Sequence, residues 1–225
     1  MQVRKDPLVT DHYYHIFSRS IAGYTVFNDD EEFSRFLEMI QLYRYDDFSH
    51  KFSKYKELDT QSQQLIVQEL RENNSVLAEI VAYCIMPTHT HLILKQTKDQ
   101  GISRYISKVL NSYTRYFNTK HKRGGPLWSS RFKSVLVSND EQLLHLTRYI
   151  HLNPSSAGLV TEPDEWDYSS LGEYISSSKD DENICTTENL FETTPTQYSK
   201  FIQDRKSYQR DLSMIKKLLL DNYTG

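Results

Sequence analysis

The sequence lacks the features that mark secreted and membrane-spanning proteins. It has only two cysteines in 225 residues, Cys84 and Cys185, and Cys84 lies in an apolar stretch. Two cysteines cannot supply a disulfide framework, so we expect a reducing, cytoplasmic compartment. No apolar run approaches the length of a membrane span, and the first residues show no signal-peptide pattern. We therefore expect no membrane association.

The chain also lacks the excess of positive charge that is common in nucleic-acid-binding proteins. Its net charge is −3, but the charges are unevenly distributed. The segment 101–139 has no Asp or Glu and contains eight basic residues: Arg104, Lys108, Arg115, Lys120, Lys122, Arg123, Arg131 and Lys133. Such a band can follow a phosphate backbone, and Trp128 and Phe132 nearby could stack on unpaired bases. We expect this segment to bind nucleic acid; the alternative is a solvated basic helix face.

Two histidines two residues apart form the most informative motif. His89 and His91 follow the apolar run 80–85 and a predicted turn at 87–88. Because residues i and i+2 of a strand point to the same face, the two imidazoles would lie side by side. Two neutral imidazoles at this spacing can bind one metal ion. For an isolated His-x-His pair, however, half-exposed strand histidines without a ligand are the commoner outcome.

A predicted helix about fifty residues later carries the second group of polar side chains. Asn139 suits its N-cap, acidic residues follow in its first turn, and Pro154 should stop it near Asn153. Tyr149 and Asn153 are one turn apart on one face, and His145 lies one turn before Tyr149. This face could offer a phenol and a carboxamide to the His pair.

His151 lies nearly opposite Tyr149 on this helix, so we interpret it as structural. Tyr113 and Tyr116 lie in the basic segment, but they fall on or beside an apolar helical stripe. Core packing is therefore their expected role. We assign no catalytic role to His15, which alternates with other residues of a predicted strand.

The predicted elements form an α+β fold. Strands are expected at 13–20, 78–86, 89–96 and 131–137, and helices at 30–43, 102–118 and from 140, with a further helix near 61–71. The order strand-helix-strand-strand-helix-strand is the ferredoxin-like pattern, an antiparallel sheet with helices on one face and the His pair on a central strand. We divide the chain into a domain at 1–175 and a linker with a C-terminal helical tail at 176–225.

Several segments together resemble the HUH single-tyrosine transposases of insertion sequences, especially their REP-associated branch. They are YHIFSR at 14–19, AYCIMPTHTHL at 82–92, YTRYFN at 113–118, LWSSRFK at 127–133, RYIHLNP at 148–154, AGLV at 157–160 and YSSL at 168–171. The chain departs from the family in having Thr88 and Thr90 where Asn and a bulky apolar residue are usual. An insertion at about 46–74 is a further departure.

The resemblance implies a function and a site. His89, His91 and Asn153 would bind Mg²⁺ or Mn²⁺, and Tyr149 would attack a DNA phosphate to give a 5′-phosphotyrosine and a free 3′-hydroxyl. His145, which shares the helix face of Tyr149, could support the site without binding the ion itself. The substrate would be single-stranded DNA with a hairpin, at a transposon end or a palindromic repeat, in the bacterial nucleoid. The protein would act as a monomer or a homodimer.

Two other functions stay open at this point. One is a domesticated protein that binds hairpin DNA without cleaving it. The other is a metal-dependent hydrolase or RNA- or DNA-binding regulator in which water, and not tyrosine, attacks.

Overall fold

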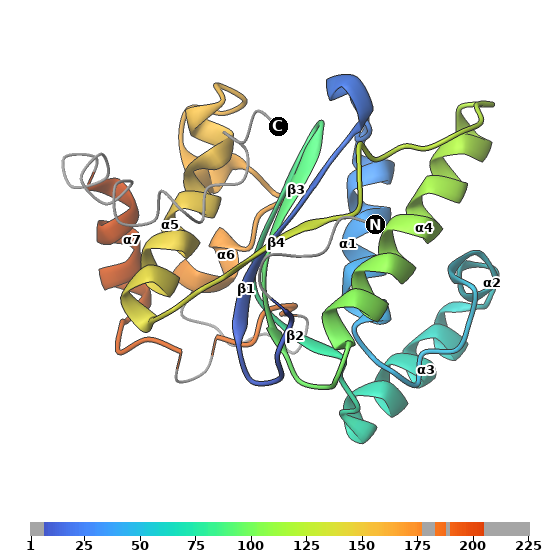
Figure 1. The fold of residues 1–225 in the computed structure, drawn as a ribbon, viewed down its shortest axis with the longest axis horizontal. Coiled ribbons are helices and arrows are strands. Elements are labelled where there is room, and N and C mark those ends of the chain that lie inside the picture. The colour runs from blue at the N-terminus through green and yellow to red at the C-terminus, as the bar shows by residue number, and fades with distance from the viewer. Residues whose placement is uncertain (1–6, 177–182, 188–189, 205–225) are drawn as a thin grey trace.

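The computed structural model describes residues 7–176, 183–187 and 190–204 (Figure 1). Four strands form one antiparallel sheet in the order β2-β3-β1-β4: β1 (Tyr13–Arg19), β2 (Ala78–Met86), β3 (His89–Gln96) and β4 (Lys133–Leu136). This order and the helices between the strands confirm the α+β, ferredoxin-like fold. β2 and β3 have the predicted bounds, and the two-residue turn between them places the His pair at the start of β3.

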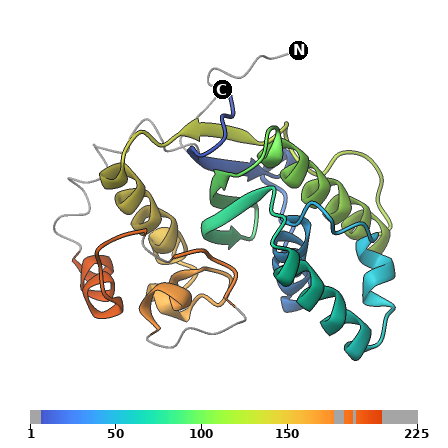
Figure 2. The ribbon, with the colours of Figure 1, turned by 90° about the horizontal axis from the view of Figure 1, so that it is seen from below.

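Helices cover both faces of this sheet (Figures 1 and 2). The first face carries α1 (Asp30–Tyr43), α2 (Phe52–Lys56), α3 (Thr60–Asn73) and α4 (Gly101–Lys120). The opposite face carries α5 (Asp140–Ser156), α6 (Leu171–Ile175) and α7 (Pro195–Gln203). Two short 3₁₀ turns, at Ile21–Gly23 and Pro163–Glu165, lie between the other elements in sequence. The sequence predicted helices on one face of the sheet, and this face is the one that α1 and α4 cover. The helices α5 to α7 form a second layer on the other face, which the prediction did not include.

Alternation along β3 divides the buried residues into two cores. Leu92 and Leu94 point into the first core, against α1 and α4, and Ile93 points into the second core, against α5. The His pair has the parity of Ile93, so both imidazoles lie on the α5 side of the sheet. Thr90 faces the first core, where its Oγ1 is buried without a hydrogen-bond partner among the described residues.

The helix α5 begins as the sequence predicts and ends later. The Asn139 side chain accepts a hydrogen bond from the Gln142 amide, as an N-cap should. The prediction that Pro154 stops the helix near Asn153 is wrong, because α5 continues to Ser156 with the proline inside it. Proline removes only its own amide donor, and the Ala157 and Leu159 amides still reach the carbonyls of Asn153 and Pro154.

The insertion forms α2 and α3, and α3 confirms the helix predicted near 61–71. Phe52 and Tyr55 of α2 are buried in the first core, and the Phe52 amide donates to the Tyr43 hydroxyl. The insertion therefore extends the α1 and α4 layer. It lies on the side of the sheet away from the His pair.

The C-terminal part that the structure describes packs into the second core. Tyr198 of α7 is buried, and its hydroxyl donates to Thr147 on α5. Residues 177–182, 188–189 and 205–225 of the predicted linker and tail lie outside the described residues. None of the helices in the described ranges is long and apolar enough to cross a membrane.

Gly101, the first residue of α4, gives a sharp stability prediction. A Cβ at this position would lie 2.0 Å from the Leu77 carbonyl oxygen, a backbone atom that cannot rotate away. We expect Gly101→Ala to lower the free energy of unfolding by about 3 kcal/mol, measured by urea denaturation. Gly172→Ala in α6 is the matched control, since its Cβ would meet no atom within 4 Å. Equal free energies of unfolding for the two variants would show that a Cβ at position 101 does not destabilise the fold.

Candidate active site

The His pair lies at the end of β3 nearest the β2–β3 turn. The His89 and His91 rings are 5.1 Å apart between centroids and almost perpendicular. The Nδ1 atom of His89 is 2.9 Å from the Thr88 Oγ1, and the Nδ1 atom of His91 is 3.0 Å from the Nε2 atom of His15. Both Nδ1 atoms are thus engaged, and the His91 Nε2 is buried without a hydrogen-bond partner among the described residues.

Burial keeps both imidazoles neutral. His91 has no exposed surface, and burial together with the neighbouring rings of His15 and His89 holds its pKa well below the usual value. Burial and the Arg19 charge lower the pKa of His89 to about 4. Because a ring nitrogen can bind a metal only through a free lone pair, neutral rings at pH 7 suit metal ligation.

The helix α5 brings two further side chains to the His pair. The Tyr149 ring is buried and meets the His91 ring edge to face, with centroids 5.9 Å apart. Asn153, one turn further on, has a buried Nδ2 atom without a partner among the described residues. The structure therefore gathers the phenol, the carboxamide and the two imidazoles that the sequence placed on separate elements.

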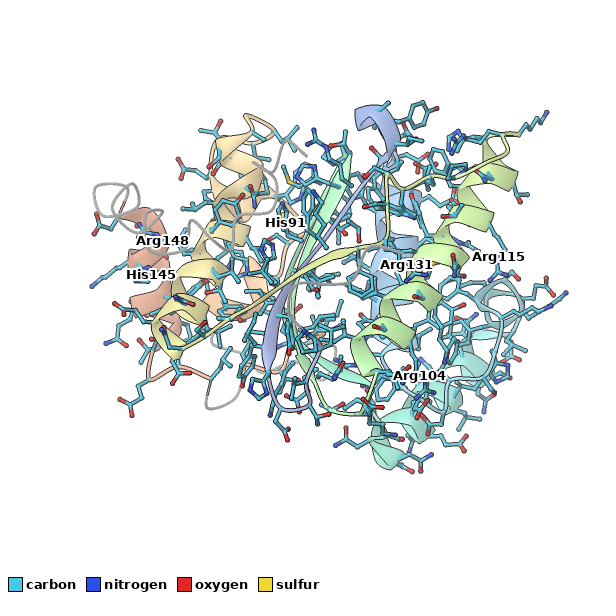
Figure 3. The ribbon with its side chains drawn as sticks, in the orientation of Figure 1. His91, Arg104, Arg115, Arg131, His145 and Arg148 are labelled. Atoms are coloured by element: carbon cyan, nitrogen blue, oxygen red, sulfur yellow. The ribbon has the colours of Figure 1, made fainter. Side chains whose placement is uncertain are left out.

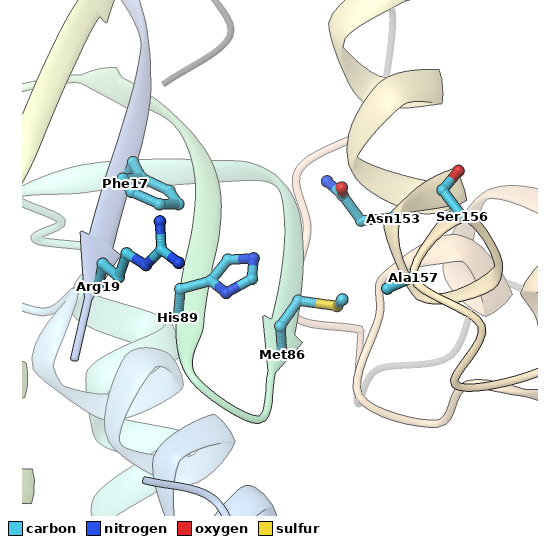
Figure 4. Close-up of a pocket in the computed structure, with 7 residues that line it drawn as sticks. All are labelled: Phe17, Arg19, Met86, His89, Asn153, Ser156 and Ala157. Atoms are coloured by element: carbon cyan, nitrogen blue, oxygen red, sulfur yellow. The ribbon is translucent and has the colours of Figure 1, made fainter. Parts of the chain in front are cut away.

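A pocket of about 270 Å³ opens beside this group, and its lining joins β1, β2, β3 and α5 (Figure 4). His89 and Asn153 lie on opposite walls, with Arg19 of β1 beside His89. The complete lining is Phe17, Arg19, Met86, His89, Asn153, Ser156 and Ala157. His91 is not part of the wall, because it lies deeper, between His89 and Tyr149.

The donor set fits a divalent ion held by two imidazoles and an amide. Among the described residues, no three His, Cys, Asp or Glu side chains gather as a metal site would require. An ion here would depend on His89, His91 and the Asn153 amide, whose oxygen is the donor. The buried Nε2 atom of His91, unpartnered among the described residues, is the observation that favours such a ligand, since buried polar groups are rarely left unpaired.

The other histidines of α5 point elsewhere. His151 is fully buried, and its ring nitrogens lie 2.8 Å from the hydroxyls of Tyr198 and Ser170, which confirms its structural role. The His145 ring packs 5.5 Å from the Phe201 ring of α7, on the outer side of α5 (Figure 3). This placement does not strengthen the supporting role considered for His145.

The basic residues of α4 lie across the sheet from the His pair, as Figure 3 shows for Arg104 and Arg115. Arg104 forms an ion pair with Asp46 of the insertion. Lys120 forms ion pairs with the acidic residues at the start of α1: Asp29, Glu31 and Glu32. Part of the predicted band is therefore neutralised by acids from other segments, which the charge count over 101–139 alone could not show.

The remaining basic residues lie on α4, on β4 and in the segment between them. Lys133 pairs in register with Phe17 of the pocket wall, so the two share a face of the sheet. Lys108, Lys122 and Arg131 are at least partly exposed. The Arg123 guanidinium lies 5.6 Å from the ring centroid of Tyr24.

The expectation that Phe132 stacks on bases is wrong, and the packing of Trp128 does not favour that role. Phe132 is 7% exposed and belongs to the first core. The Trp128 indole packs against the same core and donates to the Thr114 hydroxyl. Both rings pack in or against the first core. Tyr24, beside Arg123, is an aromatic side chain that is 50% exposed.

Sequence reasoning missed two residues of the site, Arg19 and His15. Both lie on β1, and the register of β1 against β3 sets Arg19 opposite His89 and Phe17 opposite His91. The alternation of β1 signals that His15, Phe17 and Arg19 share a face, but only the pairing of β1 with β3 identifies that face as the site.

Comparisons with known proteins show which sequences and structures this chain resembles. Residues 50–153 match the family of IS200-like transposases. A protein of Haemophilus influenzae described as a putative REP-associated tyrosine transposase is 30% identical in an alignment of 103 residues that covers 41% of this chain and 58% of that protein. The chain thus spans somewhat over half the length of this relative.

A solved structure has the same fold. The structure of a REP-associated tyrosine transposase bound to a REP hairpin superposes with a TM-score of 0.51 at 15% identity, covering 87% of this chain and 96% of that one. The resemblance seen in the sequence motifs is confirmed by the family match, and the structural match extends it to the fold.

Proposed function

We propose, from the match of residues 50–153 to the IS200-like transposases, that the protein is a metal-dependent transposase that cuts and rejoins one DNA strand near a hairpin. The observation that carries the proposal is the position of Tyr149, whose ring contacts His91. A tyrosine beside a His pair that holds a metal ion would suit nucleophilic attack on phosphorus, which supports this role for Tyr149.

The proposed reaction is a transesterification. The Tyr149 Oη forms a bond to phosphorus, the bond from phosphorus to the 3′ oxygen breaks, and that oxygen leaves as a hydroxyl after taking up a proton. The phenol loses its proton to solvent, and the product is a 5′-phosphotyrosine. Because the energy of the phosphodiester is retained, the 3′-hydroxyl of another strand can reverse the step and join the DNA.

We propose that His89, His91 and Asn153 hold the Mg²⁺ or Mn²⁺ that this reaction needs. When bound, the ion would polarise the phosphate and offset its negative charge. The imidazoles favour Mn²⁺ and the amide oxygen suits either ion. The site residues all belong to one chain, so we propose that cleavage needs no second copy, whether the protein is a monomer or a homodimer in solution.

The proposed substrate is single-stranded DNA next to a hairpin. The similar protein of known structure is described as bound to a REP hairpin, which supports this choice. We place the scissile phosphate in the pocket beside Arg19 and assign base stacking to the exposed Tyr24, which Arg123 accompanies. The exposed basic side chains of α4 would then contact more distant phosphates.

An end-labelled hairpin oligonucleotide, incubated with the protein and Mn²⁺ and run on a denaturing gel, tests the proposal. We expect a covalent protein–DNA band that disappears with a chelator and in His89→Ala. Tight binding without a covalent band would instead identify a protein that binds hairpins and does not cut them.

Arg19 gives a separate prediction about where the phosphate binds. Its side chain is exposed, lines the pocket and forms no salt bridge with the described residues. We expect Arg19→Ala to reduce the rate of adduct formation about 10- to 100-fold, the loss of one charge-assisted phosphate contact. Lys108→Ala on α4 is the control and should change the rate less than threefold. If Lys108→Ala reduced the rate more than Arg19→Ala does, the scissile phosphate would have to bind on the α4 face instead of in the pocket.

A further inference from the structure

We infer that His15 is a positioning residue for His91: it holds the Nδ1 side of that ring, so that the Nε2 atom is directed to the metal. The inference rests on the metal site of the proposed function and adds a residue outside it. His15 comes from β1, whereas the three candidate ligands come from β3 and α5.

The contact between the two rings is close and buried. The Nε2 atom of His15 is 3.0 Å from the Nδ1 atom of His91, the ring centroids are 5.2 Å apart, and the planes differ by 18°. Neither side chain has exposed surface. Because both side chains are fully buried, the hydrogen bond between the two imidazoles is shielded from bulk solvent.

The hydrogen bond restricts the tautomers of both rings. A neutral imidazole has one donor nitrogen and one acceptor nitrogen, so one ring must donate to the other. If His91 ligates an ion through Nε2, its proton must be on Nδ1, and the His15 Nε2 must accept it. His15 then carries its own proton on Nδ1. The opposite arrangement would put an N–H on the buried, unpartnered Nε2 of His91 and turn a ligand into a donor.

The neighbouring ring of Phe17 limits rotation of His91 further. Its centroid lies 4.9 Å from that of His91 and 5.5 Å from that of His89. The hydrogen bond from one side and the aromatic contact from another leave the His91 ring little freedom to turn. A ligand fixed in this way loses less entropy when the ion binds.

An imidazole at this place differs from the carboxylate that often supports a metal-bound histidine. A carboxylate would add a negative charge next to a pocket meant for an anionic phosphate, and it would be costly to bury. Neutral His15 orients His91 without that charge. Thr88, which contacts the Nδ1 of His89 through a hydroxyl, supports the other ligand in an equally neutral way.

A titration of the protein with Mn²⁺ in the absence of DNA tests the inference. The electron paramagnetic resonance signal of the free ion measures how much Mn²⁺ stays unbound. We expect His15→Ala to weaken Mn²⁺ binding about 10- to 100-fold. His15→Gln, whose side-chain oxygen can still accept the Nδ1 proton, should recover most of the affinity. His50→Ala, at an exposed histidine, is the matched control and should bind as the parent does.

The outcomes separate this inference from the proposed function. Parent-like affinity of His15→Ala, with binding lost in His89→Ala, would overturn the role of His15 and leave the metal site intact. Absence of any Mn²⁺ binding that depends on His89 would overturn both. The imidazole ¹⁵N spectrum of the parent protein without metal needs no variant: a His91 ring protonated on Nδ1 supports the inference, and protonation on Nε2 refutes it.

Discussion

Replacing Tyr149 by phenylalanine is expected to remove the covalent protein–DNA band and to lower strand cleavage on the order of 10³-fold or more. Removal of an attacking nucleophile commonly has an effect of this size or larger, because the remaining groups can only bind and polarise the phosphate. The hairpin-binding affinity should change little, since the ring itself remains. The measurement is the denaturing gel with Mn²⁺, combined with a binding titration of the same oligonucleotide.

Tyr116→Phe on α4 is the control for this substitution. The Tyr116 hydroxyl donates to Glu31 across the sheet from the pocket, so adduct formation should stay within about twofold of the parent. If Tyr149→Phe still cleaves and leaves free 5′ ends without an adduct, water is the nucleophile and the protein is a metal-dependent hydrolase. If an adduct persists in Tyr149→Phe, another tyrosine attacks.

The parts of the site that could be predicted from sequence are those set by local periodicity. The parity of β3 put His89 and His91 on one face, and the helical spacing put Tyr149 and Asn153 on another. Both relations hold in the structure because each depends only on the backbone geometry of one element. The hairpin that carries the His pair was predictable for the same reason, since a two-residue turn fixes its register.

The parts that could not be predicted depend on which elements pack together. His15 and Arg19 reach the site only because β1 pairs with β3. The alternation of residues within one strand does not show which other strand it will pair with. Arg104 is neutralised by Asp46, which is distant in sequence and belongs to the insertion. Phe132 contributes more to stability in the first core than it would on the surface, and its burial outweighed its basic neighbourhood.

Buried histidines are expected to make the protein lose stability as the pH falls below about 6.5. Burial lowers the pKa of His151 to about 3, that of His89 to about 4, and that of His91 well below the usual value. In the unfolded chain each has a pKa near 6.5, so below that pH the unfolded state binds protons that the folded state does not. Each buried histidine therefore lowers the free energy of unfolding by about 1.4 kcal/mol for every unit that the pH falls below about 6.5. Its full contribution to stability is present only above about pH 6.5.

His151 provides the cleanest test, because its partners Tyr198 and Ser170 belong to the protein and not to a ligand. Urea denaturation at about pH 7, 6 and 5 with a chelator should show a loss of stability in the parent. His151→Gln should start less stable at pH 7 and lose about 1.4 kcal/mol less per pH unit.

Two comparisons make this pH effect specific. His50→Gln removes an exposed histidine and should keep the slope of the parent. Burial raises the pKa of Glu173, which therefore binds its proton more readily in the folded state and opposes the histidines as the pH falls, but it is present in every variant and cancels between them. Equal slopes for the parent and His151→Gln would mean that His151 takes up its proton in the folded protein. The network of α5, α7 and Ser170 would then open in acid while the rest of the fold persists, and Tyr149 on the same helix would be released with it.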